Sequence, residues 1–266
     1  MEYILLLIGG LVAGTIGGLV GLGGGIVIVP LLLALGSISL IEVSPQIAVA
    51  TSMITVVITG LASTLAYIKL KRVDYKSSLY LFIGSGPGGI VGSWVNQYLT
   101  DDSFSTFFGI FIIFIATILK VRNKQKSVQI KKSSVQRKFT TIDGKTYTYG
   151  FNLKMAIMIS FFVGFISGLF GIGGGSILVP ALILLFSFPS YIAIPTSMMV
   201  VFLASIVSAV THISLGNVNW LFALLLIPGA WFGGKLGAHI NNKLSSDTVI
   251  TIFRFTLVIV GIRMIL

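Results

Sequence analysis

Two short glycine runs are the residues of this sequence best suited to bind a ligand. Residues 18–30 read GLVGLGGGIVIVP, and residues 168–180 read GLFGIGGGSILVP. Each clustered glycine weakens a helix by about 1 kcal/mol, and the proline that follows removes another backbone hydrogen bond. We therefore predict a helix break at each run, where the freed N–H groups that begin the next helix can hold an anion. The candidate binding residues in these runs are Gly23, Gly24, Gly25, Gly173, Gly174 and Gly175.

A pair of hydroxyl side chains follows each glycine run, at the predicted start of a further helix. The pairs are Thr51 with Ser52 and Thr196 with Ser197. Such hydroxyls can cap a helix or bind the oxygen atoms of a ligand, and they can equally bond back to carbonyl groups of their own helix. All four residues join the candidate substrate site. The alternative for the glycines themselves is close helix packing through small residues.

The elements that position these residues are long apolar segments. Apolar residues make up 55% of the 266 positions, charged residues only 9%, and the mean hydropathy is +1.03. Soluble domains carry about 25% charged residues. The sequence therefore predicts an all-α polytopic integral membrane protein with about eight to ten membrane segments of about 20 residues each. The apolar stretches are 3–36, 46–68, 78–99, 104–121, 151–186, 194–213, 218–240 and 248–266, and 3–36 and 151–186 are the two that the glycine runs break.

Three matched blocks in the same order predict an internal repeat. They are the two glycine runs, TSMITVV at 51–57 with TSMMVVF at 196–202, and GSGPGGIVGSWVNQYL at 84–99 with GAWFGGKLGAHINNKL at 229–244. Glycines at every fourth position of the last pair favour close helix contact. We divide the chain into repeat A at 1–121, a basic cytoplasmic linker at 122–150 and repeat B at 151–266. Of the linker we expect a solvated connector with a small turn.

Composition also excludes several classes of function. The chain has no cysteine, and its seven acidic residues all lie at segment ends or in loops, so we predict no metal site. A P-loop and a serine–histidine motif are absent, so we predict no enzyme, catalytic residue or cofactor. The net charge of +11 falls mainly in short loops beside apolar segments. This is the positive-inside pattern of a membrane protein, and we predict no nucleic-acid partner.

At these residues the chain resembles the TauE/SafE, or sulfite exporter, family of membrane permeases. The resemblance rests on GLGGGIVIVP and GIGGGSILVP, on the TSM blocks and on the glycine stretches at 84–92 and 229–237. It covers both halves of the chain and leaves out only the linker. It implies export or uptake of small anions such as sulfite, a sulfonate or an organic acid, and it selects no single substrate.

The sequence thus predicts a multi-pass plasma-membrane permease whose partners are a small anion and the lipid bilayer. The alternative is a non-transporting membrane subunit or receptor, and the oligomeric state is left open. The loop at 69–76 carries four basic residues, whereas its match at 214–219 carries no charge. Under the positive-inside rule this difference favours halves inserted in opposite orientations, with a re-entrant hairpin or two short crossings at each break. The competing arrangement has eight crossings, with the two halves parallel and both termini cytoplasmic.

Overall fold

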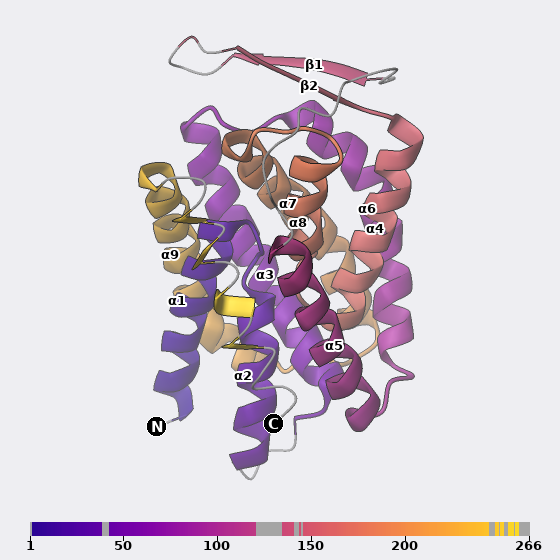
Figure 1. Ribbon diagram of the computed structural model, residues 1–266. Coiled ribbons are helices and arrows are strands. Elements are labelled where there is room, and N and C mark those ends of the chain that lie inside the picture. Colours follow the sequence, from indigo (N-terminus) through magenta and orange to yellow (C-terminus); the bar gives the residue numbers. More distant parts are fainter. Residues whose placement is uncertain are drawn as a thin grey trace.

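The fold is a bundle of helices with a two-stranded hairpin at one end (Figure 1). The structure, a computed structural model, describes residues 2–38, 43–120, 135–140, 144, 146–244, 248–249, 251–252, 255–257 and 259–260. The elements are α1 (Glu2–Val20), α2 (Gly25–Ile38), α3 (Pro45–Lys69), α4 (Tyr75–Asn96), α5 (Asp101–Lys120), β1 (Val135–Thr140), β2 (Thr146–Phe151), α6 (Leu153–Phe170), α7 (Gly175–Leu184), α8 (Ser190–Ser214) and α9 (Trp220–Lys243).

The predicted all-α polytopic membrane fold is confirmed. Five described helices, α1, α3, α6, α8 and α9, are long and apolar enough to cross a membrane. The helices α2 and α7 are apolar but shorter, and the 10 residues of α7 extend only about 15 Å, half the thickness of the hydrocarbon core. A lipid-facing surface also explains why many large apolar side chains are exposed along α1, α5 and α9.

Both predicted helix breaks are present. α1 ends at Val20 and α2 begins at Gly25, while α6 ends at Phe170 and α7 begins at Gly175. The chain turns back at the first break, because a methyl group placed on Gly17 would contact Gly24 and one placed on Gly9 would contact Leu31. Each broken segment is therefore a helical hairpin with its glycine tip inside the bundle (Figure 1), the first of the two forms that the sequence left open.

Matching seams join the two halves of the chain. α9 lies along α1 in the same direction, from Gly229 against the Leu7 carbonyl to Gly237 against the Thr15 carbonyl. At each of these positions a methyl group would strike the carbonyl oxygen of α1. The helices α4 and α6 make the same kind of seam through Gly84, Gly88 and Gly92. The glycines at every fourth position therefore serve close helix contact, as their spacing predicted.

Sequence-matched helices run in opposite directions. Thr51, near the start of α3, contacts Asn219 at the end of the loop that follows α8. Thr196, near the start of α8, contacts Asp74 at the end of the loop that follows α3. α3 and α8 are therefore antiparallel. The helices α1, α3 and α9 point in one direction, and α4, α6 and α8 point in the other. Each of α1, α3 and α4 is therefore antiparallel to its sequence match, which is α6, α8 and α9, respectively. This is the arrangement that the loop charges favoured.

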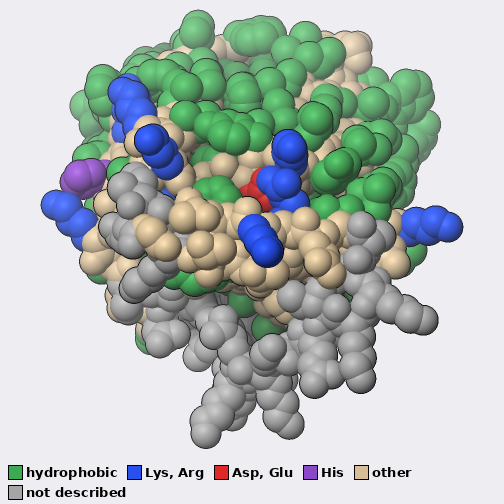
Figure 2. All heavy atoms as spheres, turned by 90° about the horizontal axis from the view of Figure 1, so that it is seen from above, with side chains coloured by type: hydrophobic (Ala, Val, Ile, Leu, Met, Phe, Trp, Pro, Cys, Tyr) green, Lys and Arg blue, Asp and Glu red, His purple; other side chains and the backbone are tan. Residues whose placement is uncertain are grey.

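Apart from Lys235 within α9, the basic side chains of the described residues gather at the end of the bundle that carries the hairpin, which Figure 2 views directly. This end includes the α3–α4 loop, the start of α6 and the end of α9. The loops at the opposite end, 97–100 and 215–219, contain no lysine or arginine. The residues concerned are Lys69, Lys71, Arg72, Lys76, Arg137, Lys138, Lys154 and Lys243.

The linker differs from the solvated connector that we expected. Strands β1 and β2 pair antiparallel from Val135–Phe151 to Thr140–Thr146. Tyr149 and Phe151 are buried, and the Tyr149 ring lies 4.0 Å, centroid to centroid, from that of Phe188 between α7 and α8. Aromatic contacts of this kind hold the hairpin on the helices. The expectations for 121–134 and 141–143 lie outside the described residues.

Candidate functional site

The two glycine breaks meet at the centre of the bundle. A methyl group placed on Gly23 would lie 3.8 Å from the Cα atom of Gly173. One placed on Gly25 would collide with the Gly171 carbonyl oxygen, and one placed on Gly175 would collide with that of Gly21. The backbones of the two halves therefore touch in a symmetrical way, and we call this contact the glycine junction (residues 21–25 and 171–175).

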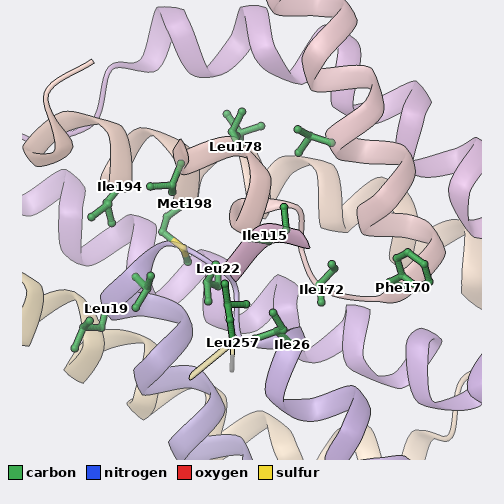
Figure 3. Packing of buried hydrophobic residues seen from close by; sticks show 14 of the residues in the cluster. Leu19, Leu22, Ile26, Ile115, Phe170, Ile172, Leu178, Ile194, Met198 and Leu257 are labelled. Carbon is green, nitrogen blue, oxygen red and sulfur yellow. The ribbon is translucent and has the colours of Figure 1, made fainter. Parts of the chain in front are cut away.

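Apolar side chains surround the glycine junction. A methyl group placed on either Gly23 or Gly173 would lie within 3.3 Å of the Cγ1 atoms of both Val56 and Val201. Leu22 and Ile172, inside the breaks, are fully buried among side chains from both halves (Figure 3). Positive φ angles of +83° at Gly23 and +78° at Gly173 explain why glycine is needed there. The junction is closed by tight packing.

The serines of the TSM blocks hold this junction together. Ser52 Oγ donates a hydrogen bond of 2.9 Å to the Gly171 carbonyl, and Ser197 Oγ donates one of 3.3 Å to the Gly21 carbonyl. Both carbonyls belong to the opposite half of the chain. Neither serine bonds back to its own helix, the alternative that the sequence left open. The hydroxyls instead satisfy carbonyl groups that the helix breaks leave without partners.

The threonines of the TSM blocks lie further from the junction. Thr51 Oγ1 accepts the N–H of Asn219, and Thr196 Oγ1 accepts the N–H of Asp74, each at 3.1 Å. Asn219 and Asp74 are the N-cap residues of α9 and α4. The structure therefore places the threonines as anchors for two helix starts, one at each end of the bundle. Of the ten candidate residues, the glycines and the serines lie together at the centre.

A buried hydroxyl at the start of α7 was missed by the sequence analysis. Ser176 has no exposed surface, and its Oγ has no hydrogen-bond partner among the described residues. The N-cap Gly174 supplies no side-chain bond, and the first helical bond runs from Ile177 N–H to the Gly174 carbonyl. The N–H groups of Gly175 and Ser176 thus have no carbonyl partner within α7. The match of Ser176 in the first half is Ile26, so the two tips differ chemically.

An ion pair fixes the hairpin to the basic end of the bundle. Asp74 accepts hydrogen bonds from Arg137 Nη2 at 2.8 Å, from Tyr149 Oη at 2.7 Å and from Ser77 Oγ at 2.6 Å. Burial alone would raise the pKa of the Asp74 carboxyl, but the bonds from Arg137, Ser77 and Tyr149 outweigh burial and leave that pKa below its ordinary value. Burial, helped by the bond to Asp74, raises the pKa of Tyr149. Both therefore keep their charge states at neutral pH.

Replacing Asp74 with asparagine should release the hairpin and lower the free energy of unfolding by roughly 1–3 kcal/mol at neutral pH. This is less than for a fully buried pair, because the Arg137 side chain is 25% exposed. The folded pKa of Asp74 is depressed, so its contribution is present above the unfolded pKa and is lost as pH falls through the folded pKa. Thermal unfolding in detergent at neutral and acidic pH measures both effects.

The control for this change is Asp102→Asn, at an exposed carboxyl that begins α5. We expect its melting temperature to follow that of the unaltered protein at each pH. Equal melting temperatures for Asp74→Asn and Asp102→Asn at neutral pH would contradict the role of Asp74 as the anchor of the hairpin.

The comparisons with known proteins agree with this architecture. The family model described as "Sulfite exporter TauE/SafE" matches residues 6–264. A Bacillus subtilis relative named "Probable membrane transporter protein YunE" is 49% identical over 100% of this chain and 98% of its own length. A Methanocaldococcus jannaschii relative, "Probable membrane transporter protein MJ0441", is 28% identical over 98% of this chain and 95% of its own.

A plant relative shares a shorter segment with the chain. The Arabidopsis thaliana protein named "Sulfite exporter TauE/SafE family protein 3" is 37% identical over 34% of this chain and 17% of its own length. No solved structure matches the chain. The match of the family model over nearly the whole length agrees with the paired glycine runs and the membrane-spanning helices. The chain belongs to the sulfite exporter TauE/SafE family and is a multi-pass membrane transporter of that type.

Proposed function

We propose that this transporter moves a small anion, such as sulfite, a sulfonate or an organic acid, across the plasma membrane. The observation that carries the proposal is the start of α7, where Ser176 Oγ is buried and, like the N–H groups of Gly175 and Ser176 at the positive end of the helix dipole, has no partner among the residues that the structure describes. Hydroxyl and N–H donors can bind an oxyanion even where the site contains no positively charged side chain. The family name points to the same substrate class.

The surroundings of this position support an anion rather than a cation. The acidic side chains of the described helices lie at their ends, as with Asp74 before α4 and Asp101 and Asp102 at the start of α5. A cation crossing the centre would meet apolar side chains, glycine backbone and the positive end of α7. An anion leaving water would instead gain hydrogen bonds from donors that are already in place, which reduces its desolvation cost.

Transport in this proposal requires the glycine junction to open. The tips of the two hairpins touch through carbonyl groups, and the bonds from Ser52 and Ser197 are modest neutral hydrogen bonds. Each contributes only about 0.5–1.5 kcal/mol, so the halves can separate and re-form the contact. Opening alternately toward each side of the membrane would expose Ser176 first to one solution and then to the other.

The test is uptake of radiolabelled sulfite by proteoliposomes that contain the purified protein. Ser176→Ala should reduce kcat/KM for sulfite by about tenfold or more, because a hydrogen bond to a charged group contributes about 1.5–3 kcal/mol. Ser160→Ala is the matched control, since Ser160 is also buried but bonds back to the Ala156 carbonyl at 2.7 Å. Its kcat/KM should stay close to that of the unaltered protein.

Three outcomes would count against the proposal. Unchanged sulfite kinetics in Ser176→Ala would remove Ser176 from the binding site. If the unaltered protein moves none of sulfite, a sulfonate or an organic acid under imposed gradients, the alternative function, a membrane subunit or receptor that does not itself transport, would be favoured. Uptake of a divalent cation as the main activity would contradict the substrate class.

A further inference from the structure

Four buried polar side chains meet where α4, α6 and α8 come together. They are Ser93 and Asn96 of α4 and Ser208 and His212 of α8, all fully buried. They surround the last turn of α6, just before the second glycine break. His212 Nε2 lies 3.1 Å from the Gly168 carbonyl oxygen, and Asn96 Nδ2 donates to the Leu169 carbonyl at 2.8 Å. We call this group of four side chains the polar pocket.

Each member of the polar pocket has an atom without a hydrogen-bond partner among the described residues. These atoms are Ser93 Oγ, Ser208 Oγ, Asn96 Oδ1 and His212 Nδ1. Leaving a buried polar group unpaired is costly, so four in one place indicate that something else binds there. Neighbouring hydroxyls behave differently: Ser160 and Thr211 both bond back to carbonyl groups of their own helices.

The first half of the chain lacks an equivalent group. At the position that matches His212, Tyr67 donates a bond of 2.7 Å to the Gly18 carbonyl. The match of Ser208 is Ser63, which donates to the Gly234 carbonyl at 2.9 Å, and the match of Ser93 is Ala238. The matching side chains around the end of α1 therefore have partners for these polar atoms. The unpaired atoms around the end of α6 are a specific feature rather than a consequence of the shared fold.

The hydrogen bond of His212 decides which species suits the pocket. The Gly168 carbonyl can only accept, so Nε2 carries the hydrogen and Nδ1 of the neutral ring is a free lone pair. A further proton would go to Nδ1, and a connecting water could link the ring to the unpaired oxygens of Asn96 and the serines. The ring also lies at the C-terminal turn of α6, where the helix dipole favours a positive charge. These features suit a proton and oppose an anion.

The charged and titratable side chains of the packed helices lie far from the ring. On α4, Tyr80 precedes Ser93 by 13 residues; on α6, Lys154 precedes Gly168 by 14 residues; on α8, Tyr191 precedes His212 by 21 residues. These separations correspond to about 20 Å or more along each helix. Tyr98, beyond the end of α4, is 79% exposed. Among the described residues of these helices, His212 is therefore the group that can take up a proton inside the bundle.

We propose that the polar pocket is a proton-binding site, in which water links the serine hydroxyls and Asn96 to Nδ1 of His212. The proposal rests on the anion transport proposed above and adds its coupling ion. His212 takes one proton from water on one side of the membrane and releases it to water on the other. For a monovalent anion this step makes transport electroneutral, because the imidazolium charge offsets the charge of the anion.

His212→Gln separates proton coupling from anion transport. Glutamine keeps an N–H donor for the Gly168 carbonyl but cannot take up a proton. In sulfite-loaded proteoliposomes, the unaltered protein should accumulate up to about tenfold more sulfite for each pH unit by which the outside is more acidic than the inside, since one proton moves inward with each anion. His212→Gln should lose this response and keep the exchange of labelled for unlabelled sulfite, which needs no net proton movement. His239→Gln, at the exposed second histidine, is the control.

A direct titration tests the site without transport. The chain has two histidines, so in the His239→Gln variant, held in lipid nanodiscs, every imidazole carbon signal comes from His212. We expect these signals to shift between about pH 8 and pH 4 as the ring takes up a proton. Constant signals over this range would overturn the proposal, as would sulfite transport by the unaltered protein that ignores the pH gradient or loss of exchange in His212→Gln. Failure of the unaltered protein to move sulfite, a sulfonate and an organic acid alike would overturn the proposed function instead, and the titration would then decide the proton site alone.

Discussion

Alanine at Gly25 or Gly175 is expected to abolish transport. The added methyl group would collide with the Gly171 carbonyl oxygen in the first case and with the Gly21 carbonyl oxygen in the second. Backbone atoms cannot swing aside like the end of a side chain, so the two halves must move apart to admit the methyl group. Overpacking of this kind costs about 1–3 kcal/mol or more. The junction would no longer close, and we expect sulfite flux in proteoliposomes to fall to the background of empty vesicles.

Gly86→Ala is the matched control for this change. Gly86 is also buried and helical, but a methyl group there would meet the Phe82 ring edge at 3.2 Å, which a small ring movement relieves. Its flux should remain within about twofold of the unaltered protein, since alanine also favours the helix by about 1 kcal/mol. The elution volume in size-exclusion chromatography and the melting temperature in thermal unfolding report whether each variant folds. Full flux in Gly25→Ala and Gly175→Ala would show that the contact at the junction is not needed for transport.

The helix breaks could be predicted because their cause is local. Three consecutive glycines and a proline weaken any helix, whatever surrounds it. The every-fourth glycines at 84–92 and 229–237 are similar, since their spacing alone places them on one helix face. The partners of Ser52 and Ser197 could not be found in this way. Each serine bonds a carbonyl more than 100 residues away, in the other half of the chain.

The hairpin and its anchor lay beyond local patterns. Polar and aromatic residues alternate in TYTYGF, as in a short strand. The docking of the hairpin, however, depends on the contact between Arg137 of β1 and Asp74, which lies in a loop 63 residues earlier. One signal was available: Asp74 is the single acid among the four basic residues of 69–76. Ser176 and His212 were hidden for another reason. The roles proposed for them rest on unpaired atoms, and these can be recognised only when every neighbour is in place.

The α3–α4 loop and the α8–α9 loop lie at opposite ends of the bundle, so we expect them on opposite faces of the membrane. Lys76, at the start of α4, and Ser214, at the end of α8, are both exposed and lie at opposite ends of the bundle. All basic side chains of the described loops are near Lys76, so the positive-inside rule assigns that end to the cytoplasm. The chain has no cysteine, so a cysteine introduced at either position reports on that position alone.

Labelling of intact cells with a membrane-impermeant maleimide therefore tests the central claim that the halves lie in opposite orientations around the glycine junction. The Ser214→Cys variant should be labelled from outside, and the Lys76→Cys variant should be labelled only after the membrane is permeabilised. Both variants should support the same sulfite flux as the unaltered protein, which confirms that the labelled molecules are folded. Labelling of both positions from the same side would mean that the halves are parallel and would contradict the account.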